Sequence, residues 1–212
     1  MGLTPETRRV VVKRSISLSA VAAAYLLNVT KDDRVELSYG QADKADLEDP
    51  SVICISVCYS GDPDLGNFCR YNPPDGPTKS AALQTFDFLL NGGGEGIRGI
   101  PGIQDRVGLI DIRKFIRVAN LIRFIDEASA RRLTFSERSR PNLWDVFGGL
   151  LLTERDPMEQ LHKGIEILRA IIESGQDPYG PLSGFDEYVA AKAARRAEVR
   201  NAANTWRSRP GS

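Results

Sequence analysis

Three segments in the first third of the chain alternate apolar and polar residues with a period of two, which is typical of β-strands. The first is interrupted by Arg14, and the third is apolar on both faces, so we expect the third to be a central strand. A stretch rich in Ala and Leu predicts a short helix between the first two strands. The predicted strands are Val10–Leu18, Arg34–Tyr39 and Ser51–Ser60, and the predicted helix is Ala20–Leu27.

Beyond residue 77 the apolar positions recur with helical spacing. The clearest helix start has Asp156 as the N-cap, Pro157 as the first helical residue and Glu159 at the third, and Gly175 stands where such a helix would end. Asn142 is a second predicted N-cap. The predicted helices are Thr78–Leu90, Val107–Leu133, Leu143–Leu152, the segment that follows Asp156, and Gly184–Trp206.

These patterns predict an α+β fold. We expect a small N-terminal sheet, antiparallel or mixed, followed by a predominantly α-helical C-terminal region. Residues 1–77 form a small β-containing acidic lobe in this interpretation, and residues 78–212 form a helical basic region packed into one compact unit with the lobe.

The charges of the chain balance, with 28 Lys and Arg against 28 Asp and Glu in 212 residues. A zero net charge argues against a protein whose whole surface coats nucleic acid or an anionic membrane. The balance is uneven along the chain, however. Residues 1–96 hold 9 basic and 13 acidic side chains, and residues 97–212 hold 19 and 15. The C-terminal half is therefore the part expected to face an anionic partner.

The basic residues of this half suggest a surface for a nucleic-acid backbone. At 100° per residue, Arg113, Arg117 and Arg131 fall within about 20° of one line on the long predicted helix. Basic side chains with neighbouring aromatic residues are what proteins use to hold phosphate backbones. Pairing with the acidic lobe is the alternative explanation. The predicted nucleic-acid-binding residues are Arg98, Arg113, Arg117, Arg131, Lys192, Arg195, Arg196 and Arg200.

The three cysteines, Cys54, Cys58 and Cys69, are too few for a disulfide scaffold, and we expect buried, inert thiols in a reducing, cytoplasmic compartment. Cys54 and Cys58 would lie about 13 Å apart on one strand face, too far to share an ion. His162 is the single histidine. A Cys–His nucleophilic pair stays open, whereas no metal and no cofactor is predicted.

The pair Arg8-Arg9 followed by a short apolar segment resembles a twin-arginine export signal. No small-x-small cleavage site follows Leu27, so the favoured interpretation is a strand that runs into a short helix, with the resemblance coincidental. No apolar run reaches about 18 residues, so no membrane-spanning helix and no membrane partner are expected.

The loop Gly92–Gly102 contains the letters of a G-x-G-x-x-G dinucleotide motif. Such a motif binds pyrophosphate when it follows a strand and opens a helix. Here the preceding segment is a predicted helix, so a flexible connection is the favoured interpretation. The motif, with Arg98 and Asp87, still supports an alternative in which the protein is an enzyme acting on a phosphorylated small molecule.

Together these features predict a non-enzymatic, self-assembling structural subunit of nucleocapsid or coat type that binds RNA or DNA. Opposite charges at its two ends favour a head-to-tail homo-oligomer. A protein-binding module, such as an inhibitor or immunity protein, is a second alternative.

Overall fold

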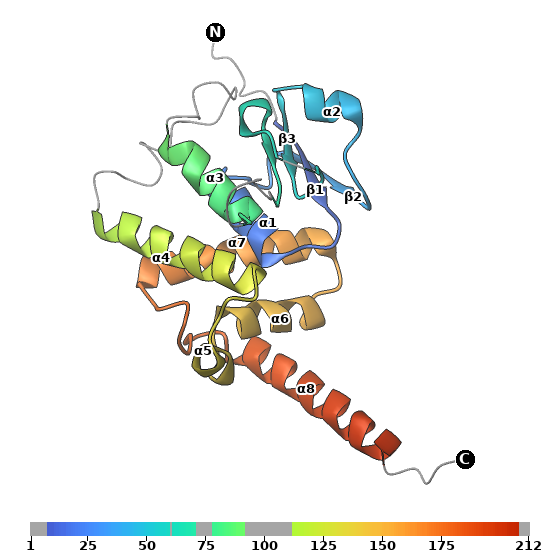
Figure 1. Cartoon of the computed structure of the whole chain (residues 1–212), viewed down its shortest axis with the longest axis vertical. Coiled ribbons are helices and arrows are strands. Elements are labelled where there is room, and N and C mark those ends of the chain that lie inside the picture. Colours follow the sequence, from blue (N-terminus) through green and yellow to red (C-terminus); the bar gives the residue numbers. More distant parts are fainter. Residues whose placement is uncertain (1–7, 60, 71–77, 92–111, 208–212) are drawn as a thin grey trace.

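A computed structural model describes residues 8–59, 61–70, 78–91 and 112–207. Its N-terminal part is a four-stranded sheet in the order β2-β1-β3-β4, and every pairing in it is parallel. The strands are β1 (Arg9–Lys13), β2 (Arg34–Ser38), β3 (Val52–Ile55) and β4 (Asn67–Phe68). The α+β class is confirmed, because helices make up most of the rest (Figure 1).

The prediction of an antiparallel or mixed sheet was wrong. Helix α1 (Leu18–Leu26) lies between β1 and β2, and α2 (Lys44–Glu48) lies between β2 and β3. A helix that packs on the sheet carries the chain back to the edge where it started, so the next strand runs parallel to the last. The predicted first strand was also too long, since Ser17 caps the helix that begins at Leu18.

The sheet is covered on both faces. On one face, Val10, Val12 and Ile53 belong to a large core shared with α1. On the other face, Val11 and Cys54 belong to a smaller cluster under α2. The two clusters lie on opposite faces because successive side chains of a strand point to opposite sides of the sheet. A strand that is buried on both faces has a continuous run of apolar residues in its sequence, as β3 does.

The large core continues into the helical part, and residues on both sides of position 77 contribute to it. Helix α1 packs against α3, α4 and α7, while α8 packs on α6 and extends away from the body (Figure 1). The predicted caps Asp156 and Asn142 accept backbone N–H bonds as expected, and Gly175 has φ 72°. The helices are α3 (Ala81–Leu90), α4 (Ile112–Ser129), α5 (Phe135–Ser139), α6 (Leu143–Thr153), α7 (Pro157–Ser174) and α8 (Asp186–Arg207).

The two arginines of the twin-arginine-like pattern hold the amino-terminal edge of the sheet together. Arg8 forms a two-pronged ion pair with Asp33 and also donates to the carbonyls of Leu27 and Asn28. Arg9, the first residue of β1, pairs with acidic side chains of β2 and α2, namely Glu36 and Asp46. The predicted strand that runs into a short helix is confirmed.

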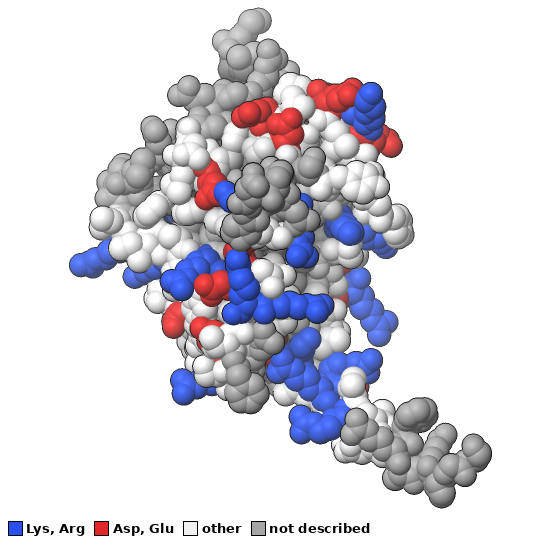
Figure 2. Space-filling view, in the orientation of Figure 1, with Lys and Arg blue, Asp and Glu red and all other residues white. Residues whose placement is uncertain are grey.

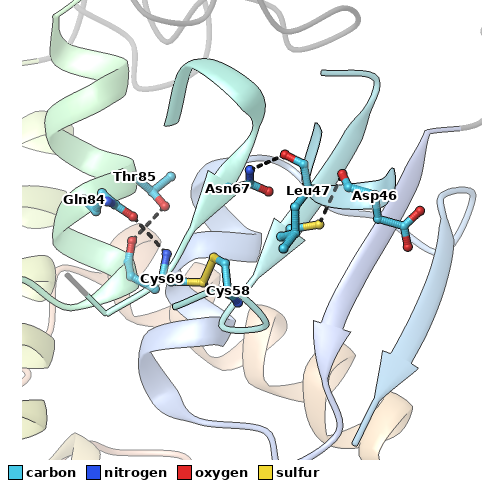
Figure 3. The surroundings of a disulfide bond; sticks show 9 residues. Asp46, Leu47, Cys58, Asn67, Cys69, Gln84 and Thr85 are labelled. Atoms are coloured by element: carbon cyan, nitrogen blue, oxygen red, sulfur yellow. Dashed lines mark hydrogen bonds between the residues drawn. A yellow bond between two sulfur atoms is a disulfide. The ribbon is translucent and has the colours of Figure 1, made fainter. Parts of the chain in front are cut away.

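The prediction of three free thiols was wrong for two of them. β3 ends at Ile55, so Cys58 lies beyond the strand and forms a disulfide with Cys69, which follows β4 (Figure 3). Cys54 is a buried free thiol, and burial raises its pKa to about 12. The Cys58–Cys69 disulfide does not indicate the cellular compartment, and the reducing, cytoplasmic compartment stays a prediction.

The long predicted helix ends earlier than expected. The backbone N–H of Arg132 donates to the carbonyl of Glu127, and the backbone N–H of Arg131 donates to that of Ala128. This is the Schellman arrangement that terminates a helix. Arg131 therefore has φ 58° and does not share the helical register of Arg113 and Arg117.

Within the described ranges, no helix is both long enough and apolar enough to cross a membrane. Over the same ranges, no cluster of three or more His, Cys, Asp or Glu side chains is placed to hold a metal ion.

Candidate anion-binding site

The carboxyl ends of the strands meet at one edge of the sheet, between β1 and β3. In the strand order, β2 lies on one side of β1 and β3 lies on the other. The connection that follows β1 and the connection that follows β3 therefore lead in opposite directions from this point. In open parallel sheets, ligands bind in the crevice that this divergence creates. The connections that follow β1 and β3 supply Ser17 and Ser56 to the cavity at this edge.

This cavity, called the edge cavity below, has a volume of about 410 Å³. That volume falls in the range of small-molecule sites, about 300–1,000 Å³. One wall is apolar and comes largely from α6, through Trp144, Phe147 and Leu151. The polar residues that line the cavity are Ser17, Ser19, Ser56, Arg70, Thr78, Ser80, Asp126, Ser129 and Lys192.

The amino end of α1 opens into the edge cavity. The Ser17 hydroxyl accepts from the backbone N–H of Ala20, which leaves the N–H groups of Leu18 and Ser19 outside the hydrogen-bond ladder of the helix. The helix dipole places partial positive charge at these groups. An anion in the cavity would therefore meet backbone donors as well as side chains.

Two cationic side chains also line the cavity, Arg70 after β4 and Lys192 on α8. Neither makes an ion pair or a hydrogen bond with the part of the chain that the structure describes. Arg70 is exposed and Lys192 is half-buried. Two like charges held around one cavity without acidic partners favour a negatively charged occupant.

Asp126, the acidic residue of the cavity wall, does not balance these charges. One carboxylate oxygen accepts from the backbone N–H of Ser80 at 2.8 Å, which fixes the start of α3. The other oxygen is ion-paired with Arg132. Asp126 is 5% exposed, and both of its carboxylate oxygens therefore interact with groups of the fold itself.

The segment after β3 is held in an unusual conformation. Ser56 has φ 60°, a left-handed backbone that costs a residue with a side chain about 1–2 kcal/mol. Its N–H donates to the carbonyl of Phe68, and the Cys58–Cys69 disulfide joins the two following segments. Cys69 in turn donates its backbone N–H to Gln84 on α3, as Figure 3 shows. These bonds fix Ser56 and the neighbouring Arg70 at the cavity.

Two glycines of α6 let α8 carry Lys192 to the cavity. A Cβ atom at Gly149 would lie 1.8 Å from the carbonyl oxygen of Tyr188, and one at Gly148 would lie 2.9 Å from the Lys192 ammonium. A side chain at position 149 would therefore push α8 away, whereas one at position 148 would displace only the flexible end of Lys192. One turn further along α8, Arg196 lies 2.6 Å from the buried carboxylate of Asp145 and fastens the two helices together.

The structure brings together three of the predicted nucleic-acid-binding residues. Lys192 lines the edge cavity, while Arg131 and Arg196 line a neighbouring cavity that shares Trp144 with it. Arg98 and the Gly92–Gly102 motif lie outside the described residues. Figure 2 shows basic side chains over the helical half of this face and acidic ones near α2.

The remaining predicted residues lie elsewhere. Arg117 donates to the carbonyls of Ile172 and Glu173, so it satisfies the carboxyl end of α7. Arg113 is exposed on α4 and has a partner of its own. On the outer surface of α8, Arg195 pairs with Glu198 and Arg200 is exposed.

Sequence reasoning missed Ser17, Ser56 and Arg70. A signal for Ser17 existed, since a serine before an Ala-rich helix is a strong N-cap. Arg70 follows a strand of two residues, which is too short to produce a pattern. No family model, no curated protein and no solved structure matches this chain.

Proposed function

We propose that the protein binds a phosphorylated small molecule in the edge cavity. The observation that carries the proposal is a pair of cations, Arg70 and Lys192, with no acidic partner among the described residues, around a cavity that also receives the amino end of α1. Phosphate groups suit such a combination of backbone donors, hydroxyls and cations. The apolar wall from α6 would receive the rest of the molecule.

The proposal is one of binding. The hydroxyls of Ser17 and Ser56 have no histidine or free carboxylate beside them among the described lining residues, and Asp126 is already engaged. A fixed cradle of donors does not need such groups to hold an anion. The ligand class is the same as in the enzyme alternative that the sequence supports, but this proposal does not use the Gly92–Gly102 loop.

Calorimetric titration with inorganic phosphate and ribose 5-phosphate tests the proposal. We expect both to bind, and we expect Arg70→Gln and Lys192→Gln each to weaken binding about tenfold or more, because a hydrogen bond to a charged group contributes about 1.5–3 kcal/mol. Arg34→Gln and Lys44→Gln are matched controls, since both side chains are exposed at the opposite edge of the sheet or on α2. No binding by the wild type, or equal losses in the controls, would overturn the proposal.

The nucleic-acid-binding, self-assembling subunit stays a prediction. The same variants separate it from the proposal. A backbone-binding surface along α8 would make Arg200→Gln weaken RNA binding as much as Lys192→Gln, with a steep dependence on salt. A small-molecule site would leave phosphate binding unchanged in Arg200→Gln.

A further inference from the structure

A second cavity of about 270 Å³, called the side cavity below, adjoins the edge cavity. Trp144 lines both, and it is 41% exposed. Lys192 of the edge cavity and Arg196 of the side cavity are one turn apart on α8, about 6 Å along its axis. A single ligand with a phosphate group in the edge cavity therefore has its other end within reach of the side cavity.

The wall of the side cavity carries a buried acceptor. Oδ1 of Asp145 receives no hydrogen bond, although the residue is only 4% exposed. Arg196 Nη2 lies 2.6 Å away, but this contact is a charge pair that lacks hydrogen-bond geometry. Buried acceptors are rarely left without a donor in proteins. A group with an N–H would supply it.

The backbone is also strained at the edge cavity. Among the described residues, three other than glycine have a positive φ, namely Asn28, Ser56 and Arg131. Asn28 is of a type that tolerates this conformation and Arg131 ends α4 in a Schellman arrangement, whereas Ser56 lines the edge cavity. Strain that a fold maintains tends to be found where ligands bind.

From these features we infer that the ligand is a nucleotide, an inference that rests on the proposed function. The phosphate occupies the edge cavity between the start of α1, Arg70 and Lys192. The base stacks on Trp144 in the side cavity and donates an N–H to Asp145. Aromatic stacking and a buried carboxylate are the two contacts that a base with a ring N–H or an exocyclic amino group uses, and a plain sugar phosphate has no aromatic ring for the first.

Calorimetric titration with ribose 5-phosphate and GMP, on the wild type and on Trp144→Leu, tests the inference. We expect GMP to bind the wild type about tenfold more tightly than ribose 5-phosphate does, from stacking of one base. In Trp144→Leu the two affinities should become equal, because only GMP loses a stacked base. Equal affinities in the wild type, or equal losses for both ligands in the variant, would overturn the inference.

Two further measurements guard against a variant that alters the fold. The chain has two tryptophans, so Trp206→Phe leaves Trp144 as the sole indole, and GMP should quench its fluorescence while ribose 5-phosphate does not. Asp145→Ala and Arg196→Ala both break the ion pair between α6 and α8, but only the first removes the acceptor oxygens. GMP should therefore lose its advantage over ribose 5-phosphate in Asp145→Ala and keep it in Arg196→Ala.

The outcomes separate the two proposals. If neither phosphate, ribose 5-phosphate nor GMP binds, the proposed function fails. If ribose 5-phosphate binds and GMP binds no better, the edge cavity holds an anion and the nucleotide inference alone fails.

Discussion

Basic side chains lie at both the amino-terminal and the carboxyl edge of the parallel sheet, but only those at the amino-terminal edge pair with acidic residues that the structure describes. At the amino-terminal edge, Arg8 and Arg9 are covered by Asp33, Glu36 and Asp46. At the carboxyl edge, Arg70 and Lys192 have no acidic partner in the described chain. The charges of the amino-terminal edge are thus paired within the fold and contribute to its stability. Cations left without partners at a cavity are therefore the ones to examine for binding.

The largest effect is expected at the amino-terminal edge, from Arg8→Ala. The Arg8 and Asp33 side chains are 14% and 7% exposed. Removing the guanidinium leaves a buried carboxylate without its counter-charge and the carbonyls of Leu27 and Asn28 without its hydrogen bonds, although the Thr30 N–H still donates to Asp33. We expect the free energy of unfolding to fall by about 3–5 kcal/mol in urea titrations. Arg34→Ala, at the exposed start of β2, serves as the control and should cost less than about 1 kcal/mol. Similar losses in both variants would contradict the assignment of Arg8 as a structural residue.

The second effect concerns the bond that ties the carboxyl edge together. Replacing Cys58 and Cys69 by serine removes a crosslink between positions 11 residues apart. We expect the free energy of unfolding to fall by about 2–3 kcal/mol, since the unfolded chain becomes freer. Reductant should destabilise the wild type by a similar amount and leave the double variant unchanged. If reductant does not change the free energy of unfolding of the wild type, the disulfide does not stabilise this edge and packing alone does.

The third effect is a pH dependence specific to the amino-terminal edge. The hydrogen bonds from Arg9 lower the pKa of Glu36 below its ordinary value of 4.5. A lowered folded-state pKa means that the stabilisation is fully present above pH 4.5 and is lost as the pH falls toward the folded-state pKa. Denaturant titrations between pH 6 and pH 3, about the range of this transition, should show a smaller loss for Arg9→Gln than for the wild type. Lys192→Gln should follow the wild-type profile; parallel profiles for all three proteins would exclude this role of Glu36.

The smallest effect is expected where the cations are unpartnered. Arg70→Gln and Lys192→Gln should change the free energy of unfolding by less than about 0.5 kcal/mol, because neither change breaks an ion pair with a described residue. Saturating phosphate should raise the melting temperature of the wild type and of Arg34→Gln more than that of these two variants. A large loss of stability in the absence of phosphate would reveal a structural role and remove the contrast between the edges.

Local sequence signals predicted the elements that depend on neighbouring residues. Asp156, Asn142 and Gly175 act through bonds within one helical turn, and the structure confirms all three positions. The parallel arrangement of the sheet was missed because strand direction depends on where α1 packs, which the alternation of Val10 and Val12 does not encode.

The candidate site was less accessible to sequence reasoning for the same reason. Ser17, Ser56 and Lys192 are distant in the sequence and converge through the sheet order and the packing of α8 on α6. Lys192 was found through its charge alone. The disulfide was missed because Cys58 was placed on a strand that in fact ends at Ile55.

The close packing at Gly149 has a consequence for the order in which the protein becomes functional during synthesis. The backbone donors of Leu18 and Ser19 emerge from the ribosome early, whereas Lys192 joins them only after α8 has been made and has docked on α6. A nascent chain can therefore form its sheet and still lack one of the two cations of the edge cavity. If the edge cavity binds an anion as proposed, tight binding is expected only of chains that have passed this late step, and a bulky substitution at position 149 would weaken it.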